Sequence, residues 1–313
     1  MKIILQVSGG IGKSIMATAV CKAIKVQYPD SKLMVLTGYP QAFEGNRRIY
    51  EVVAPNEQAY FYRNHIEGQA DTKFFLQDPY FETEFIQRRG HLVKVWCEMN
   101  GIQYNGELPE LFLNHKERTS FGALVNLPPG RPLLVLQTNG GMPNNTDKYS
   151  WPRDLPFDTA QKVVNAFAHT HNVVQIRRKD QLTLQNVFPA DSPSMRQLAV
   201  LIGMSDKRLF IDSFGQHAAA ALGLPSVVCW IANVPSQFGY EMHTNIMANE
   251  PTLSPELRYA TFAKYNTNGP EAEFPYNNED EIFDADRIIE ALHAEKKKDA
   301  DKVKQNGVAE VVA

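Results

Sequence analysis

Short apolar runs that alternate with turns and helical patterns most strongly limit how this 313-residue chain can fold. Residues 3–7 form one such run, 8–12 a glycine-rich turn, 14–28 a helical spacing and 33–36 the next run. This alternation is typical of a parallel sheet whose faces are covered by helices. The first part of the chain is therefore predicted to form an α/β lobe.

The alternation begins again after a connector rich in proline at residues 127–132. Two series of similar length predict an α/β protein of two Rossmann-like, doubly wound lobes that face a cleft. We expect a first domain over 1–127, a second over 128–283, and a terminal helix with a frayed tail over 284–313. The aromatic-rich stretch 50–112 has no clear assignment. In the second series the predicted strands are 133–137, 173–176, 209–212 and 227–231, and the predicted helices are 157–170, 195–202 and 216–222.

The charge balance argues against one class of partner. The chain has 32 Lys and Arg residues against 35 Asp and Glu residues, a formal net charge of −3. A dedicated nucleic-acid binder needs a basic surface that displaces counterions from the phosphate backbone. We therefore expect no nucleic-acid partner.

Three features bear on the compartment in which the chain resides. Its strongest apolar stretch, 225–234, is far shorter than the roughly 20 apolar residues that cross a bilayer. Residues 1–10 turn polar too soon for a signal peptide. The cysteines Cys21, Cys97 and Cys229 lack CxxC spacing and are predicted to be reduced core thiols. A cytoplasmic location without a transmembrane segment is expected, and peripheral membrane contact is left open.

The first candidate site is the glycine turn that contains Gly9, Gly10 and Gly12. It fits neither the P-loop nor the dinucleotide-binding spacing of glycines. A glycine turn at a helix N-terminus nevertheless presents backbone N–H groups to an anion. Lys13 lies in the first turn of that helix and opposes its dipole. Two readings stay open: an anion sits near Lys13, or Lys13 points into water.

A second candidate site follows the predicted strand 209–212. Asp212 can accept from hydroxyl groups, and Ser213 can donate to a phosphate. Gly215 is expected to turn the chain, and Gln216 and His217 to begin a helix of small residues. The alternative makes Asp212 or Ser213 an ordinary N-cap and His217 a structural histidine.

A third candidate site is the polar loop 137–152, which follows the first strand of the second series. Thr138 and Asn139 offer hydrogen-bond donors there, and Lys148 offers a positive charge for phosphate. Gln175 is assigned to the same site from the neighbouring strand. Arg177 follows that strand and can reach a phosphate or a ribose, with a basic surface turn as the alternative.

Possible metal motifs are discounted. Two DAD triplets, 284–286 and 299–301, lie in a charged helical tail, where charges are usually solvated. His169 and His171 form a single HxH without a third ligand. No metal site is expected.

Three segments resemble one known family. Residues 10–18 (GIGKSIMAT) are similar to its glycine turn and following helix, 148–152 (KYSWP) to its Lys and Trp-Pro element, and 212–225 to its Asp-Ser, His, Ala-rich and Gly-x-Pro signature. The family is the ADP-heptose:lipopolysaccharide heptosyltransferases and their relatives, glycosyltransferase family nine, which have the GT-B fold. The similarity covers most of the chain.

The resemblance implies an inverting glycosyltransferase that needs no metal or other cofactor. It would move a sugar from a nucleotide-diphosphate donor to a hydroxyl of a glycan or glycolipid acceptor, in cell-envelope or glycan biosynthesis. The first lobe, around Asp78, Pro79 and Tyr80, would hold the acceptor. The donor would lie in the second lobe, bordered by Thr138, Asn139, Lys148, Gln175, Arg177, Asp212, Ser213, Gly215, Gln216 and His217.

One departure from the family bears on catalysis. The family places an Asp, the base that deprotonates the acceptor, at the position that Lys13 occupies here. A protonated lysine has no lone pair with which to accept a proton. Either Lys13 loses its charge by burial, or a carboxylate such as Asp78 takes the role, or Lys13 contacts phosphate. Phe214 also replaces a family glycine, and Gly215 follows it.

Two other functions on the same scaffold are kept as alternatives. A nucleotide-sugar epimerase or hydrolase would turn over the donor without an acceptor. A non-catalytic protein would bind a sugar nucleotide or glycan and transfer nothing. Fold alone does not choose among these.

Overall fold

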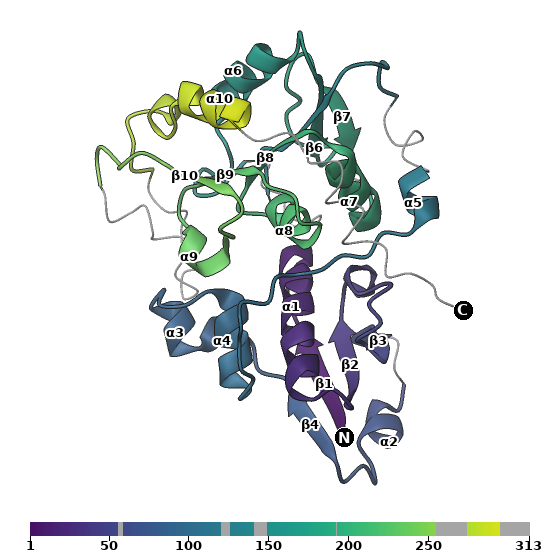
Figure 1. Cartoon of the computed structure of the whole chain (residues 1–313). Helices are drawn as coiled ribbons and strands as arrows, with labels where there is room; N and C mark the ends of the chain where they lie inside the picture. Colours follow the sequence, from purple (N-terminus) through teal and green to yellow (C-terminus); the bar gives the residue numbers. More distant parts are fainter. Residues whose placement is uncertain (56–58, 120–125, 141–148, 192, 255–273, 295–313) are drawn as a thin grey trace.

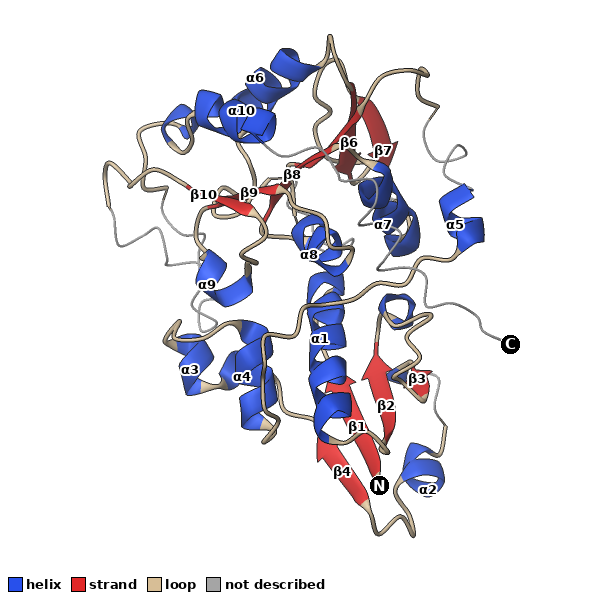
Figure 2. Ribbon diagram, in the orientation of Figure 1, coloured by secondary structure: helices blue, strands red, loops and turns tan. Residues whose placement is uncertain are grey.

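The structure, a computed structural model, describes residues 1–55, 59–119, 126–140, 149–191, 193–254 and 274–294. Two lobes are visible, each built on its own sheet (Figures 1 and 2). All strand pairs in both sheets are parallel. The predicted architecture of two doubly wound α/β lobes is confirmed.

In the part of the first lobe that the structure describes, four strands form a sheet in the order β3-β2-β1-β4. Its central strand β1 is apolar because both of its faces are covered, and Ile3, Ile4 and Leu5 are fully buried. The elements are β1 (Lys2–Val7), α1 (Ile11–Gln27), β2 (Lys32–Thr37), η1 (Pro40–Ala42), β3 (Glu51–Val53), α2 (Phe61–His65), β4 (Thr72–Phe75), η3 (Pro79–Phe81), α3 (Thr83–Ile86) and α4 (Leu92–Met99).

In the second lobe, six strands of the described chain form a sheet in the order β10-β9-β8-β5-β6-β7. Local sequence explains where α7 begins, because Ser194 and Gln197 form a capping box at its start. The elements are α5 (His115–Thr119) in the connection, then β5 (Leu133–Gln137), α6 (Phe157–Phe167), β6 (Asn172–Arg177), β7 (Phe188–Asp191), α7 (Met195–Met204), β8 (Lys207–Ile211), α8 (Phe214–Ala221), β9 (Val227–Trp230), α9 (Pro235–Phe238), β10 (Thr244–Met247), η7 (Glu279–Glu281) and α10 (Ala285–Ala294).

The two lobes share a core across helix α1. In Figure 1 the N-terminal end of α1 meets α8 of the other lobe. One continuous apolar cluster contains Val20 of α1, Ala218 of α8 and Val135 of β5. The polar side chain of Thr18, inside this core, donates to the Ile15 carbonyl at 2.6 Å. The lobes are therefore packed together along α1 and α8.

The terminal helix α10 lies against α6 on the second lobe (Figure 1). Its Ile288 and Leu292 are fully buried, so its apolar stripe completes a second core cluster. The rest of the predicted charged tail, from 295 onward, lies outside the described residues. The cysteines Cys21, Cys97 and Cys229 are buried and free, as predicted. No helix in the described chain is both long enough and apolar enough to cross a membrane.

The strand orders define where a ligand can bind. In each sheet the order reverses direction beside the first strand of the lobe, between β1 and β4 and between β5 and β8. Ligands of such sheets bind outside the carboxyl ends of the strands at this switch point. The segments that leave these strands are 8–12 and 76–78 in the first lobe and 138–140 and 212–213 in the second.

Candidate functional site

The glycine turn after β1 shapes the start of α1. Gly9 has a φ of +96°, a conformation that glycine adopts without strain, and Gly10 is the N-cap of α1. The Cβ of any other residue at position 12 would lie 2.8 Å from Cδ2 of His217. The turn therefore brings the N-terminus of α1 directly against α8.

Lys13 and Asp78, assigned separately from the sequence, form an ion pair. Lys13 Nζ lies 2.8 Å from Asp78 Oδ1, and the two side chains are 3% and 24% exposed. The Lys13 ammonium also lies over the rings of Tyr80 and Trp96, 4.3 and 5.2 Å from their centroids. Lys13 therefore points into the lobe and away from water.

Three donors hold the carboxylate of Asp78. Besides Lys13, the Tyr80 amide donates to Oδ1 at 2.9 Å and the Ser8 hydroxyl to Oδ2 at 3.0 Å. Burial by itself would raise the pKa of Asp78, but the hydrogen bonds from Lys13, Tyr80 and Ser8 outweigh it and lower that pKa. Asp78 is therefore an ionised, partly exposed carboxylate at the edge of the first lobe.

In the second lobe, Asp212 follows β8 and accepts a hydrogen bond from the Asn233 amide. Burial raises the pKa of Asp212, against the opposing charge of Arg153 and the hydrogen bonds from Asn233 and Gln216. Sequence reasoning missed Asn233 and Arg153. The position of Asn233 just after β9 was the available signal, since polar residues that follow parallel strands gather at the same edge.

Tyr80 connects the two halves. Burial raises the pKa of its phenol, the carboxylates of Asp212 and Asp78 raise it further, and Arg153 opposes them. Such effects require proximity. Tyr80 of the first lobe thus lies within electrostatic range of Arg153 and Asp212 of the second, and its ring contacts that of Phe238 edge-on, with the centroids 6.3 Å apart. We call Lys13, Asp78, Tyr80, Arg153 and Asp212 the interlobe site.

The loop after β5 is organised by Asp154, which the sequence did not single out. This buried carboxylate accepts from the Gly140 amide at 2.8 Å, the Ser150 amide at 3.0 Å and the Asn139 side chain at 3.1 Å. Thr138 donates its hydroxyl to Asn139 Oδ1 at 2.8 Å. The side chains of Thr138 and Asn139 therefore shape the loop. Lys148 lies outside the described residues.

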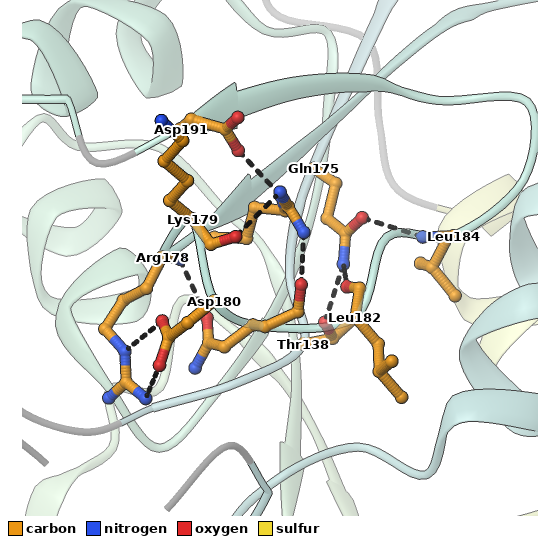
Figure 3. Close-up of polar contacts among 10 residues, drawn as sticks. Thr138, Gln175, Arg178, Lys179, Asp180, Leu182, Leu184 and Asp191 are labelled. Carbon is orange, nitrogen blue, oxygen red and sulfur yellow. Dashed lines mark hydrogen bonds and ion pairs between the residues drawn. The ribbon is translucent and has the colours of Figure 1, made fainter. Parts of the chain in front are cut away.

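Gln175 and Arg177 also hold a loop. Figure 3 shows Gln175 between Thr138, Leu182 and Leu184, with the Leu184 amide donating to Oε1 at 3.0 Å. Arg177 Nε donates to Asp191 at 2.6 Å, and its Nη groups donate to the carbonyls of Lys179 and Gln181. Both side chains therefore fix the segment 178–184 at the carboxyl edge of the sheet.

Gln137 ties the first strand of the second lobe to helix α8. Its Nε2 donates to the Ser213 hydroxyl at 3.1 Å, and its Oε1 accepts from the Gly215 amide at 2.9 Å. The expectation that Gly215 turns the chain is wrong, because α8 already begins at Phe214. Glycine is needed there because a Cβ would lie 2.5 Å from Phe210.

Gln216 and His217 are buried at the lobe contact. Gln216 donates to the Phe238 carbonyl at 3.1 Å, and His217 Nδ1 lies 3.0 Å from the Tyr240 hydroxyl. The rings of His91, His217 and His243 all lie within 5.7 Å of the Tyr240 ring, centroid to centroid. His217 therefore contacts α1 and Tyr240 in this structure.

We predict that acid destabilises this histidine cluster. Burial, with His91 and His243 nearby, lowers the pKa of His217 to about 3, and burial lowers the pKa values of His91 and His243 to about 4. Unfolded histidine titrates at about 6.5, so the unfolded chain binds more protons below that pH. The three neutral histidines therefore make their full contribution to the free energy of unfolding above about pH 6.5. That contribution is lost as pH falls toward 4, by up to about 1.4 kcal/mol per pH unit for each histidine.

Urea unfolding at pH 7, 6 and 5 measures this loss. His243→Gln is expected to make the unfolding free energy depend less steeply on pH, because one of the three buried histidines no longer titrates. His169→Gln, at an exposed position, is the matched control and should leave it unchanged. An identical pH dependence in both variants would contradict a titrating cluster.

Across the described ranges, no group of three or more His, Cys, Asp or Glu side chains is arranged to hold a metal ion.

Neither a protein-family model nor a curated protein matches the amino-acid sequence. Solved structures do match. The glycosyl transferase family 9 protein of Veillonella parvula has a TM-score of 0.66 at 12% identity and covers 93% of this chain and 96% of its own. The ADP-heptose lps heptosyltransferase II of E. coli has a TM-score of 0.68 at 13% identity, with 98% and 100% covered. TibC of enterotoxigenic E. coli, an iron-containing dodecameric glycosyltransferase, has a TM-score of 0.61 at 12% identity, with 97% and 78% covered.

These matches extend over both lobes of the chain. The chain therefore has the GT-B fold of the family nine glycosyltransferases, as the sequence motifs predict. At identities of 12–13%, the TM-scores of 0.66 and 0.68 establish similarity of fold alone.

Proposed function

We propose that the protein is an inverting glycosyltransferase that moves a sugar from a nucleotide diphosphate to an acceptor hydroxyl. The observation that carries the proposal is the interlobe site. An ionised carboxylate, Asp78, follows β4 at the switch point of one sheet. Tyr80 beside it lies within electrostatic range of a cation and a carboxylate, Arg153 and Asp212, at the carboxyl edge of the other sheet. The fold supports it, because the similar structures include nucleotide-sugar transferases.

Asp78 would act as the general base on the acceptor. As the acceptor oxygen bonds to the anomeric carbon, its proton passes to the Asp78 carboxylate and the bond from that carbon to the diphosphate breaks. Displacement from the face opposite the leaving group inverts the configuration. Asp78 is 24% exposed, so an acceptor can reach it.

The second lobe would bind the donor. Arg153 is exposed beside the 138–140 loop, where a Cβ on Gly140 would lie 2.6 Å from Arg153 Cδ. A guanidinium there can bind the diphosphate bidentately and stabilise the departing charge, together with Lys148 and the N-terminus of α8. Asp212 can accept from sugar hydroxyls. Thr138, Asn139, Gln175 and Arg177 would support this site by shaping its loops.

The remaining parts of the proposal concern setting and cofactors. We propose metal-independent transfer, in cell-envelope or glycan biosynthesis, in the cytoplasm. Because TibC contains iron, transfer measured before and after treatment with a chelator tests the first part. Unchanged rates support it, and activity restored only by a metal overturns it.

Calorimetric titration with ADP, UDP and GDP sugars tests the donor site. Arg153→Ala is expected to weaken binding of the preferred donor by about tenfold or more, since a hydrogen bond to a charged group contributes about 1.5–3 kcal/mol. Lys148→Ala is expected to act in the same direction. Arg131→Ala, at the opposite end of β5, is the control and should bind like the wild type.

The outcomes separate the functions. Binding of no nucleotide sugar, or binding that Arg153→Ala leaves intact, overturns the donor assignment. Turnover of the donor without an acceptor identifies an epimerase or hydrolase, and binding without turnover across a set of acceptors identifies a binding protein.

A further inference from the structure

Lys13 is a buried charge whose ammonium is surrounded by side chains of the first lobe. Only 3% of its side chain is exposed, and its ammonium is enclosed by Asp78, Tyr80 and Trp96. A Cβ at Gly9 would lie 3.3 Å from Lys13 Cδ, so the positive-φ glycine leaves room for the lysine stem. The turn and the aromatic rings together direct Lys13 toward Asp78.

The contacts of Lys13 determine how Asp78 is presented. Oδ1 accepts from Lys13 at 2.8 Å and from the Tyr80 amide at 2.9 Å, whereas Oδ2 accepts from the Ser8 hydroxyl at 3.0 Å. A carboxylate oxygen has two lone-pair positions. The protein donors thus occupy Oδ1, and Oδ2 keeps acceptor capacity for a proton from outside.

From this geometry we propose that Lys13 is the positioning residue of the base: it holds Asp78 ionised and oriented, and it neither takes the proton nor binds the diphosphate. This inference rests on the proposed function, in which Asp78 is the base. The ion pair also offsets the cost of a cation in the first turn of α1, because Asp78 supplies a negative charge close to the helix N-terminus.

Replacing Lys13 has a defined consequence for Asp78. Lys13→Met keeps a long apolar side chain but removes the ammonium. The hydrogen bond from Lys13 is the largest of the effects that lower the pKa of Asp78 against its burial, and this variant removes it. The pKa of Asp78 then rises, and the acid limb of the kcat profile moves to higher pH. We expect kcat at neutral pH to fall about tenfold through loss of orientation, with the dissociation constant of the donor unchanged within about twofold. Lys13→Arg keeps the charge and is expected to restore most of kcat.

The test combines two measurements on the full chain. The first is the pH dependence of transfer, with donor binding by calorimetry, for the wild type, Lys13→Met and Lys13→Arg. The second is NMR titration of the Asp78 carboxyl carbon in the same three proteins, assigned with Asp78→Asn, which needs neither donor nor acceptor. Should Lys13→Met fail to fold, Lys13→Arg and Ser8→Ala, which removes the donor to Oδ2, are titrated instead.

Each result has one meaning. A higher pKa of Asp78 in Lys13→Met, with a matching move of the acid limb and unchanged donor binding, supports the positioning role. Donor binding that falls tenfold or more while Asp78 titrates as in the wild type overturns it and makes Lys13 a phosphate ligand. Absence of transfer in the wild type, with the Asp78 carboxyl still responding to Lys13, refutes the proposed function and leaves the coupling of the pair intact.

Discussion

Replacing Asp78 by Asn is expected to lower kcat for sugar transfer by about 10²- to 10⁴-fold, the usual contribution of a general base. Asn keeps the size of the side chain and its acceptor for the Tyr80 amide, but it cannot take a proton. Donor affinity should stay within about twofold, because Asp78 lies in the first lobe. Steady-state kinetics and calorimetry on the same preparations measure the two quantities.

Asp78→Asn leaves the buried Lys13 ammonium without its carboxylate, which lowers the free energy of unfolding. A fall in kcat caused by unfolding therefore has to be distinguished from one caused by loss of the base. The double variant Lys13→Met/Asp78→Asn removes both charges and should be inactive yet folded. Asp71→Asn, at an exposed carboxylate paired with the Met1 amine at 3.1 Å, is the control and should retain full activity. Near-normal kcat in Asp78→Asn would show that the base lies elsewhere.

Gly12→Ala is expected to destabilise the protein by about 1–3 kcal/mol, the cost of inserting a methyl group into a packed contact. Its Cβ would lie 2.8 Å from Cδ2 of His217. The imidazole cannot swing away cheaply, because His217 is buried and lies 3.0 Å from the Tyr240 hydroxyl. Urea unfolding measures the loss, and kcat should fall with it because the two lobes meet at this contact.

Gly10→Ala is the matched control, two residues away in the same turn. Gly10 has a φ of −87°, which alanine adopts freely, and no atom beyond the local backbone lies within 4 Å of the position its Cβ would take. Its unfolding free energy should fall by less than about 1 kcal/mol, the cost of alanine at an N-cap, and therefore by less than in Gly12→Ala. Equal stability of the two variants would mean that α1 and α8 separate without cost.

The interior of both sheets could be predicted, and their edges could not. The strands found from the sequence, such as β1 and β5, are covered on both faces and form continuous apolar runs. The strands that were missed, β3, β4, β7 and β10, are three or four residues long and lie at the ends of the two sheet orders. A short strand with one neighbour has too few buried positions to leave a pattern.

The side chains that belong to the candidate site could be predicted more readily than the contacts they make with one another. A polar side chain after a predicted strand identified Asp212 as a candidate, whereas Asp78 became one only through the family resemblance. Nothing in a linear sequence indicates that Lys13 reaches a carboxylate 65 positions later. Arg177 shows the same limit, since its guanidinium is engaged by Asp191 and two backbone carbonyls.

The sequence by itself determined the two α/β lobes, the buried cysteines and three of the segments at the carboxyl ends of strands, 8–12, 138–140 and 212–213, because periodicity and turn chemistry are local properties. Only the tertiary structure decided that Lys13 pairs with Asp78, that Gly12 packs against His217, and that Arg153 lies within electrostatic range of Asp212. These pairings join distant segments, and their energies depend on burial and on distances of a few ångströms, which exist only after the lobes have packed.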